Sequence, residues 1–216
     1  MLEGKLNPMP SLEQEITLKT LTPPLEHSQI TLRDTRAQDF DSYLRWREPG
    51  AEWKEWDAPW EKSGPLLEGE RKNWVRKARA RNSQEPRTHL EIETHGGVHI
   101  GFVSAYWTED WTDSAQDWLS IGLVICESAY WSRGYGRAAL ECWTDYLFSR
   151  ADCARVGIST WSGNERMARL SMAMGFVEEG RFRGARAVKG VRFDALQFGL
   201  LKEEWAAQAW SRVALS

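Results

Sequence analysis

The sequence predicts an α/β or α+β fold in which helices flank a mixed β-sheet. Strand-like and helical segments follow one another along most of the chain. Residues 119–126 are almost all apolar, which is typical of a strand in the middle of a sheet. A helical segment over 136–150 joins this strand to an alternating strand over 155–161. Such a β-α-β crossover predicts a parallel strand pair in the middle of the chain.

Length and composition narrow the class of protein. The chain has 216 residues and a mass of 24.9 kDa, which fits one domain. Hydrophobic residues make up 42% and charged residues 27%, so the chain is expected to fold rather than to be disordered throughout. The net charge of −3 argues against a general nucleic-acid binder. No apolar run approaches the roughly 20 residues of a membrane span, and the N-terminus lacks a secretory signal.

The cysteines and histidines predict neither a disulfide framework nor a metal site. The cysteines are Cys126, Cys142 and Cys153, an odd number without a CxxC pair. The four histidines do not pair at helical i, i+4 spacing, so no metal is expected. His89 and His99 are expected at most to face one another across a hairpin. A reducing, cytoplasmic location fits this composition best.

The chain divides into an extension, a main domain and a tail. Residues 1–28 hold four prolines and little helical spacing, with a short edge strand expected at 15–18. The folded domain is expected over 29–206 and a C-terminal tail over 207–216.

The elements of the domain follow in order. A strand is expected at 30–33, and the capping-box pattern from Thr35 to Gln38 predicts that a helix begins there. Pro65 opens a second helix expected over 65–82. A helix over 164–174 ends at Gly175. Strands are expected at 88–94, 98–107, 119–126, 155–161, 182–188 and 193–201.

A glycine-rich loop lies between the apolar strand and the helix that follows it, at Trp131-Ser-Arg-Gly-Tyr-Gly-Arg-Ala138. Glycines let a backbone approach a phosphate closely, and the first N–H groups of a helix carry partial positive charge. A P-loop is excluded because no Gly-Lys-Ser/Thr ends the run. Gly134-x-Gly136-x-x-Ala139 matches a loose dinucleotide fingerprint, but no carboxylate ends the next strand. A loop whose glycines only make a turn is the other alternative.

Several ordered blocks resemble the GCN5-related N-acetyltransferase (GNAT) family, specifically its ribosomal-protein branch (RimJ/RimL-like). The loop matches the family's Gln/Arg-x-x-Gly-x-Gly/Ala pattern as Arg133-x-x-Gly136-x-Ala138. The other matching blocks are Ile121-Gly-Leu-Val-Ile125, Trp161-Ser-Gly-Asn164, Gly175-Phe-Val-Glu-Glu-Gly180, Gly190-x-x-x-Asp194 and Leu200-Leu-Lys-Glu-Glu-Trp205. The resemblance covers 119–205, extends more weakly to 30–46, and implies a mostly antiparallel mixed sheet with a splayed central strand pair.

The resemblance also implies acetyl-CoA as co-substrate. The strand backbone at Leu123, Val124 and Ile125 would then hold the pantetheine arm and the acetyl carbonyl. The loop amides of Arg133, Gly134, Tyr135, Gly136, Arg137 and Ala138 would hold the pyrophosphate. Asn164 would hydrogen-bond the pantetheine or the thiol end. Ser162-Gly-Asn-Glu165 is itself a capping-box pattern, so shaping the start of a helix is the alternative role of Asn164.

The catalytic positions depart from the family pattern. The family commonly uses direct attack by the amine, with a Tyr seven residues after the Asn as acid, and here that position is Ser171. This serine is the catalytic candidate, and a hydroxyl bonded back to a helix carbonyl is its structural alternative. No base matches the family, because Ser120 and Arg186 occupy positions where relatives carry carboxylates. The remaining base candidates are Glu93, Glu109, Asp117 and Asp194, and a water chain is an alternative.

An acceptor site is expected near the tryptophans of Ala51-Glu-Trp-Lys-Glu-Trp-Asp-Ala-Pro-Trp60, because aromatic faces mixed with carboxylates suit a cationic amine. Plain helix–sheet packing is the alternative for these side chains. Trp111 belongs to an aromatic group that would cover the cleft or form a subunit contact. The sequence therefore predicts an N-acetyltransferase acting on a protein N-terminus or a small-molecule amine, and leaves a homodimer open. A catalytically weak acyl-CoA-binding module of the same fold and a nucleotide-binding oxidoreductase are the rival functions.

Overall fold

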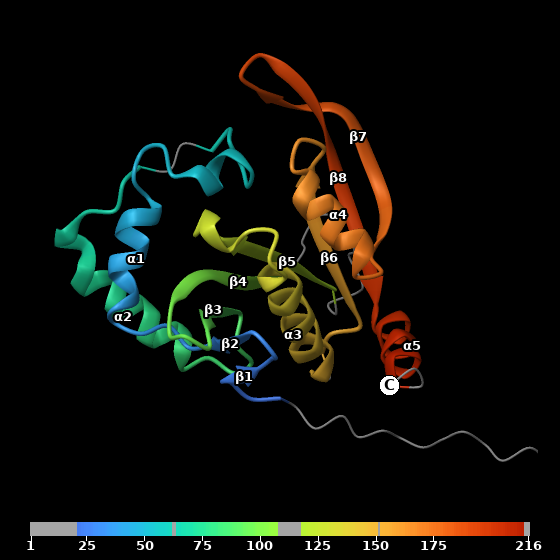
Figure 1. Ribbon diagram of the computed structural model, residues 1–216, viewed down its shortest axis with the longest axis horizontal. Coiled ribbons are helices and arrows are strands. Elements are labelled where there is room, and N and C mark those ends of the chain that lie inside the picture. Colours follow the sequence, from blue (N-terminus) through green and yellow to red (C-terminus); the bar gives the residue numbers. More distant parts are fainter. Residues whose placement is uncertain (1–20, 62–63, 108–117, 151, 214–216) are drawn as a thin grey trace, which may run out of the picture.

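In the computed structural model, eight strands form one sheet in the order β1-β2-β3-β4-β5-β6-β8-β7 (Figure 1). The structure describes residues 21–61, 64–107, 118–150 and 152–213. The strands are β1 (Leu25–Glu26), β2 (Ile30–Arg33), β3 (His89–Thr94), β4 (His99–Trp107), β5 (Trp118–Ile125), β6 (Arg155–Trp161), β7 (Val177–Val188) and β8 (Val191–Leu201). All neighbours are antiparallel except the central pair β5–β6, as expected for a mixed, mostly antiparallel sheet.

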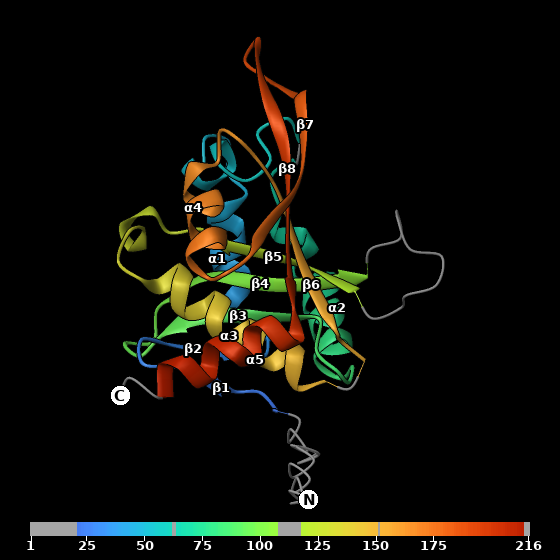
Figure 2. The same ribbon diagram turned by 90° about the vertical axis from the view of Figure 1, so that its right-hand side faces the viewer.

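The helices lie between and after these strands. They are α1 (Asp39–Trp46), α2 (Arg71–Asn82), α3 (Tyr135–Ser149), α4 (Glu165–Ala173) and α5 (Lys202–Val213), with short 3-10 turns η1 (Glu52–Glu55), η2 (Glu68–Glu70) and η3 (Ser128–Tyr130). Figure 2 shows the β7–β8 hairpin rising well beyond the rest of the sheet. Among the described helices, none is both long and apolar enough to cross a membrane.

The two faces of the sheet differ because side chains alternate along each strand. On β3, Leu90 and Ile92 are fully buried in the apolar core together with residues of α3 such as Trp143. Glu91 lies between them in sequence, so it points to the opposite face, where α1 packs. One face of the sheet is therefore apolar and the other holds a buried polar cluster.

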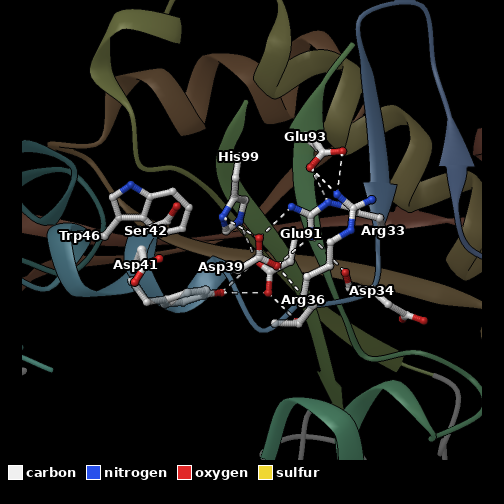
Figure 3. Close-up of polar contacts among 12 residues, drawn as sticks. Arg33, Asp34, Arg36, Asp39, Asp41, Ser42, Trp46, Glu91, Glu93 and His99 are labelled. Carbon is white, nitrogen blue, oxygen red and sulfur yellow. Dashed lines mark hydrogen bonds and ion pairs between the residues drawn. The ribbon is translucent and has the colours of Figure 1, made fainter. Parts of the chain in front are cut away.

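Charged and polar side chains from β2, β3, β4 and α1 meet in that cluster (Figure 3). Arg33 forms a bidentate ion pair with Asp39 at 2.8 Å and a second pair with Glu93 at 2.7 Å. His99 Nε2 lies 3.0 Å from Glu91 Oε2. Arg33, Asp39, Glu91 and His99 are buried, and a buried charge is tolerated only when it is paired and hydrogen-bonded. The cluster therefore joins α1 to the sheet with a defined geometry.

The two central strands separate along their length. β5 pairs with β6 only at Trp118, Leu119 and Ser120, whereas it pairs with β4 over its whole length. Figure 1 shows β5 and β6 running apart toward their carboxyl ends. The predicted β-α-β crossover and the splayed central pair are both confirmed.

Several boundaries differ from the prediction. The first helix begins at Asp39 rather than at Thr35, because the Thr35 hydroxyl donates to Glu91 across the sheet instead of capping a helix. The second helix begins at Arg71 rather than at 65. The final hairpin starts five residues earlier than expected, at Val177. Strand β1 lies within the expected extension, and α5 crosses the expected boundary at 206. The strand expected at 15–18 lies outside the described residues.

Candidate active site

A cavity of about 660 Å³ lies at the carboxyl end of β5. Four segments line it: residues 53–57 before α2, the end of β5, the loop 130–137 that leads into α3, and the N-terminal half of α4. Seven predicted cofactor residues line this cavity: Leu123, Val124, Ile125, Gly134, Gly136, Arg137 and Asn164. The cavity therefore lies where β5 and β6 separate, and seven of the residues predicted to bind the cofactor line it.

The edge of β5 that faces the splay lacks a neighbouring strand beyond Ser120. The backbone N–H of Cys126 donates to Ile100 on β4 at 2.8 Å. Because strand residues direct their backbone groups to alternate sides, Leu123 and Ile125 direct theirs away from β4. The Ile125 carbonyl already accepts from the indole of Trp131 at 2.7 Å. The backbone of Leu123 and the N–H of Ile125 remain as polar groups for an extended ligand.

The glycine loop ends in the N-terminus of α3. Gly134 precedes the helix with φ of +89°, a left-handed conformation that favours glycine. No side chain caps this helix, and the first intrahelical bond runs from Ala138 N to Gly134 O at 2.9 Å. The N–H groups of Tyr135, Gly136 and Arg137 therefore lack an intrahelical acceptor, which makes this end of the cavity suited to an anion.

Three predicted loop residues do not line the cavity with their side chains. The Arg133 side chain is exposed, Ala138 is buried under the helix, and the Tyr135 ring packs edge-to-face on Tyr130 at 5.2 Å. Any contribution of these three residues to cofactor binding comes from their backbone groups.

Asn164 immediately precedes α4 and Ser171 lies within it, but of the two only Asn164 lines the cavity. Asn164 Oδ1 accepts from Met167 N at 3.1 Å, so the residue caps the helix as its alternative reading expected. Its amide nitrogen remains as a donor toward the cavity. Ser171 is fully buried and its hydroxyl donates to the Met167 carbonyl at 2.9 Å. The hydrogen bond from the Ser171 hydroxyl to the Met167 carbonyl matches the structural alternative for this residue. A catalytic role for Ser171 stays a prediction.

Trp53, Trp56 and Asp57 line the cavity at the expected acceptor side, and residues 53–57 are called the acceptor wall below. The indole of Trp161 on β6 donates to the carbonyls of Trp56 and Asp57, at 2.9 and 3.1 Å. Arg166 of α4 lies between Trp56 and Trp131, with its guanidinium carbon 4.2 and 4.6 Å from the two ring centroids. Cation–π contacts of this kind join three segments around the opening of the cavity.

The β7–β8 hairpin also contacts this segment. Lys189 Nζ lies 2.5 Å from Glu55, and the Arg186 guanidinium lies 4.7 Å from the Trp60 ring centroid. Trp60 therefore packs against other side chains, which was the alternative to an acceptor role for the tryptophans. Trp53 and Trp56, in contrast, line the cavity. Tertiary contacts from β6, α4 and the hairpin position the acceptor wall, and no local pattern in the sequence reveals them.

The base candidates from the sequence lie in other pairs. Glu93 is bound by Arg33 and Arg36 in the buried cluster. Asp194 accepts from the Gly184 backbone and from Arg181, and these hydrogen bonds lower its pKa. Glu109 and Asp117 lie outside the described residues, as does Trp111. Neither described candidate lines the cavity, so both carboxylates act as structural partners.

A family model described as an acetyltransferase (GNAT) domain matches residues 29–177, which is more than half of the chain. The chain belongs to the GNAT acetyltransferase family. A curated relative of this GNAT protein is the "Putative ribosomal N-acetyltransferase YdaF" of Bacillus subtilis (strain 168), which is 32% identical over 88 residues. The aligned part is 38% of this chain and 48% of that relative, so the chain spans about half the length of the relative it matches.

Solved structures share the fold of this GNAT protein at low sequence identity. An acetyltransferase of the GNAT family from Bacillus anthracis has a TM-score of 0.64 and 16% identity, over 83% of this chain and 99% of that one. A chimera of the spermidine N-acetyltransferase SpeG from Vibrio cholerae with hSSAT has a TM-score of 0.62 and 17% identity, over 83% and 99%. At such identities the likeness shows the fold alone.

Replacing Trp161 with phenylalanine is expected to loosen the acceptor wall of this GNAT protein without unfolding it. Phenylalanine keeps a ring against Phe193 and Trp60 but removes the N–H that donates to the wall. A lost hydrogen bond costs about 1 kcal/mol, so amide hydrogen exchange in residues 52–60 should become roughly fivefold faster. Trp118→Phe is the matched control, because the Trp118 indole nitrogen is buried without a hydrogen-bond partner among the described residues. Equal exchange in the two variants would contradict the anchoring role.

Proposed function

We propose that this chain transfers an acetyl group from acetyl-CoA to an amine by direct attack in a ternary complex. The observation that carries the proposal is the cavity at the splay of β5 and β6, which joins an unpaired strand edge to an uncapped helix N-terminus. An acyl-CoA has the matching parts, because its arm carries amides and its other end carries phosphates. Acetyl-CoA supplies an activated thioester carbonyl to this site.

The residues that would hold the co-substrate follow from the site. The free backbone groups of Leu123 and Ile125 suit the amides of the pantetheine arm. The N–H groups at the start of α3, together with the Arg137 side chain, suit the pyrophosphate. The Asn164 amide nitrogen suits a carbonyl or the sulfur end of the arm.

The acceptor proposed for this site is an amine, either a protein N-terminus or a small molecule. Carboxylates and tryptophans on residues 53–57 give the acceptor wall a face suited to a cation. The names of the relatives support an amine in general: one refers to ribosomal N-acetylation and another to spermidine. A homodimer and a cytoplasmic location remain proposals that accompany this function.

A thermal melt with and without acetyl-CoA tests the proposal. At 100 times Kd a ligand stabilises the folded state by about 2.7 kcal/mol, which for a chain of this size raises Tm by roughly 5–10 °C. Gly136→Glu is expected to abolish this shift, because it places a carboxylate where the phosphates would lie. The variant should still fold, since its Cβ would meet only Leu170 and Ile125 atoms at 3.7 and 3.9 Å, and acidic residues stabilise the first turn of a helix.

Gly69→Glu is the matched control, because Gly69 is exposed and a Cβ there meets nothing within 4 Å. It should show the wild-type shift. An unstabilised wild-type protein would refute the acetyl-CoA assignment, and a shift with NAD(H) instead would favour the oxidoreductase rival. Stabilisation without turnover of any amine would favour the acyl-CoA-binding module.

A further inference from the structure

One carboxylate in the cavity has no role in the site described so far. Two carboxylates line the cavity, and Glu165 is paired with Arg169 at 3.1 Å. Asp57 differs, because among the described residues its carboxylate makes no ion pair and accepts no hydrogen bond. A charged group held in a cavity without a partner is available to a ligand.

Hydrogen bonds from Trp161 hold the backbone at Asp57 in place. The Trp161 indole donates to the Asp57 carbonyl at 3.1 Å and to the preceding carbonyl at 2.9 Å. Leu123 of β5 lines the same cavity. Burial raises the pKa of Tyr106 on β4, and the charge of Asp57 raises it further. Burial likewise raises the pKa of Cys126 after β5, followed by the charge of Glu91 and then that of Asp57. Asp57 thus lies within electrostatic reach of the strand that borders the splay.

The environment of Asp57 also changes its acidity. Burial first, and then the negative charge of Glu61, raise the pKa of Asp57 to about 6. The side chain is nevertheless accessible to solvent through the open cavity. Protein surrounds the cavity while water still reaches the carboxylate, so the group remains able to exchange protons with a ligand.

We propose that Asp57 binds the ammonium group of the acceptor and takes its proton before the amine attacks. This inference rests on the proposed function and adds the catalytic base that the sequence did not identify. One N–H bond of the ammonium breaks and an O–H bond forms on Asp57. The neutral amine then attacks the thioester carbonyl carbon, a C–N bond forms, the C–S bond breaks, and the sulfur leaves with a second nitrogen proton as the free thiol. Asp57 afterwards returns its proton to solvent.

The groups around Asp57 come from four elements. Glu61 lies on the same segment, Tyr106 on β4, Cys126 at the end of β5, and Arg166 on α4. Arg166 is held between Trp56 and Trp131, so its charge is directed to the rings. After burial, Glu61 is the group among these whose charge raises the pKa of Asp57.

The pH dependence of acetyl transfer tests the proposal. The measurement is release of coenzyme A thiol between pH 5.5 and 9, with short peptides bearing a free N-terminal amine and linear polyamines as acceptors. For the wild type, kcat/KM should rise with an inflection near pH 6 and then level off. Asp57→Asn should lower kcat/KM at pH 7 by about 10²–10⁴-fold. Its remaining activity should rise about tenfold per pH unit up to the pKa of the amine, because only acceptor that is already neutral can react.

Three further variants separate a base from a merely structural residue. Asp57→Glu should restore part of the activity together with the inflection. Glu61→Gln should move the inflection to lower pH, since it removes a charge that raises the pKa of Asp57. Glu48→Gln, an exposed carboxylate that precedes this segment, should match the wild type.

The proposal and the proposed function fail in different ways. The acetyl-CoA melt shift should be unchanged in Asp57→Asn, because the carboxylate acts on the acceptor. A wild-type pH profile in Asp57→Asn, or loss of the melt shift in that variant alone, would overturn the role of Asp57 as base. A wild-type protein without any melt shift would instead overturn the proposed function.

Discussion

Replacing Glu91 with glutamine is expected to destabilise the protein by about 3–5 kcal/mol, the usual cost of breaking a buried ionic network. Four donors converge on the fully buried carboxylate: Thr35 at 2.5 Å, Tyr43 at 3.0 Å, His89 at 3.1 Å and His99 at 3.0 Å. Glutamine offers one oxygen and turns an NH₂ group toward these donors. For a chain of this size, Tm should fall by roughly 6–20 °C.

The same carboxylate makes stability depend on pH. Burial alone would raise the pKa of Glu91, but hydrogen bonds from His89 and His99 and their charges outweigh it, and the folded-state pKa lies well below the ordinary glutamate range. The stabilisation is therefore complete above the unfolded-state pKa of about 4.3 and is lost as pH falls through the lowered folded-state value. The difference in Tm between wild type and Glu91→Gln should shrink as pH falls below about 4.

Glu165→Gln provides the control for this experiment. Its carboxylate is exposed and pairs with Arg169 one turn away, so the same substitution should leave Tm nearly unchanged. Chemical or thermal unfolding of the three proteins measures the effect. A fall in Tm of less than 2 °C in Glu91→Gln at neutral pH would show that the cluster contributes little to stability.

Gly101→Ala is expected to destabilise the protein and to weaken acetyl-CoA binding together. A Cβ on Gly101 would lie 2.0 Å from the Val124 carbonyl oxygen and 3.0 Å from Ile125 Cα. Both atoms are backbone, so β4 and β5 must move apart to admit the methyl group. Overpacking of this kind costs about 1–3 kcal/mol, and more where backbone must shift. The displaced strand is the one that borders the cavity.

Gly180→Ala tests the same substitution at a site with room. Its Cβ would meet Gln197 Cβ at 3.6 Å, an ordinary contact. Alanine there should be neutral or stabilising by about 0.4–1 kcal/mol, because it restricts the unfolded chain. Opposite changes in Tm are therefore expected, with the acetyl-CoA shift reduced only in Gly101→Ala. Equal Tm values would show that the strand pair accommodates the methyl group easily.

The elements that the sequence predicted best are those with a strong local period. Residues 155–161 alternate clearly, and β6 has the same bounds. The helix over 136–150 differs from α3 by one residue at each end. Prediction failed where a long-range contact competed with a local signal. Thr35 carries a capping pattern, yet it bonds to Glu91, which lies 56 residues further along the chain.

The candidate site divides in the same way. The glycine loop and Asn164 were recognisable from spacing, and both border the cavity. Ser171 shares the periodic face of Asn164, but helix geometry turns its hydroxyl back to Met167. Asp57 was visible only as one acidic residue among several in a tryptophan-rich segment. Its raised pKa comes from burial and from Glu61, which composition alone does not reveal.

By itself, the sequence determined the order of strands and helices, the family resemblance and the loop expected to bind phosphates, because these depend on patterns within short segments. The tertiary structure alone decided which carboxylates are paired and, among the described residues, which carboxylate of the cavity lacks an ion pair. It also decided how Trp161, Arg166 and the β7–β8 hairpin hold the acceptor wall. The physical reason is that pairing, burial and acidity depend on groups distant in sequence, which only the folded chain brings together.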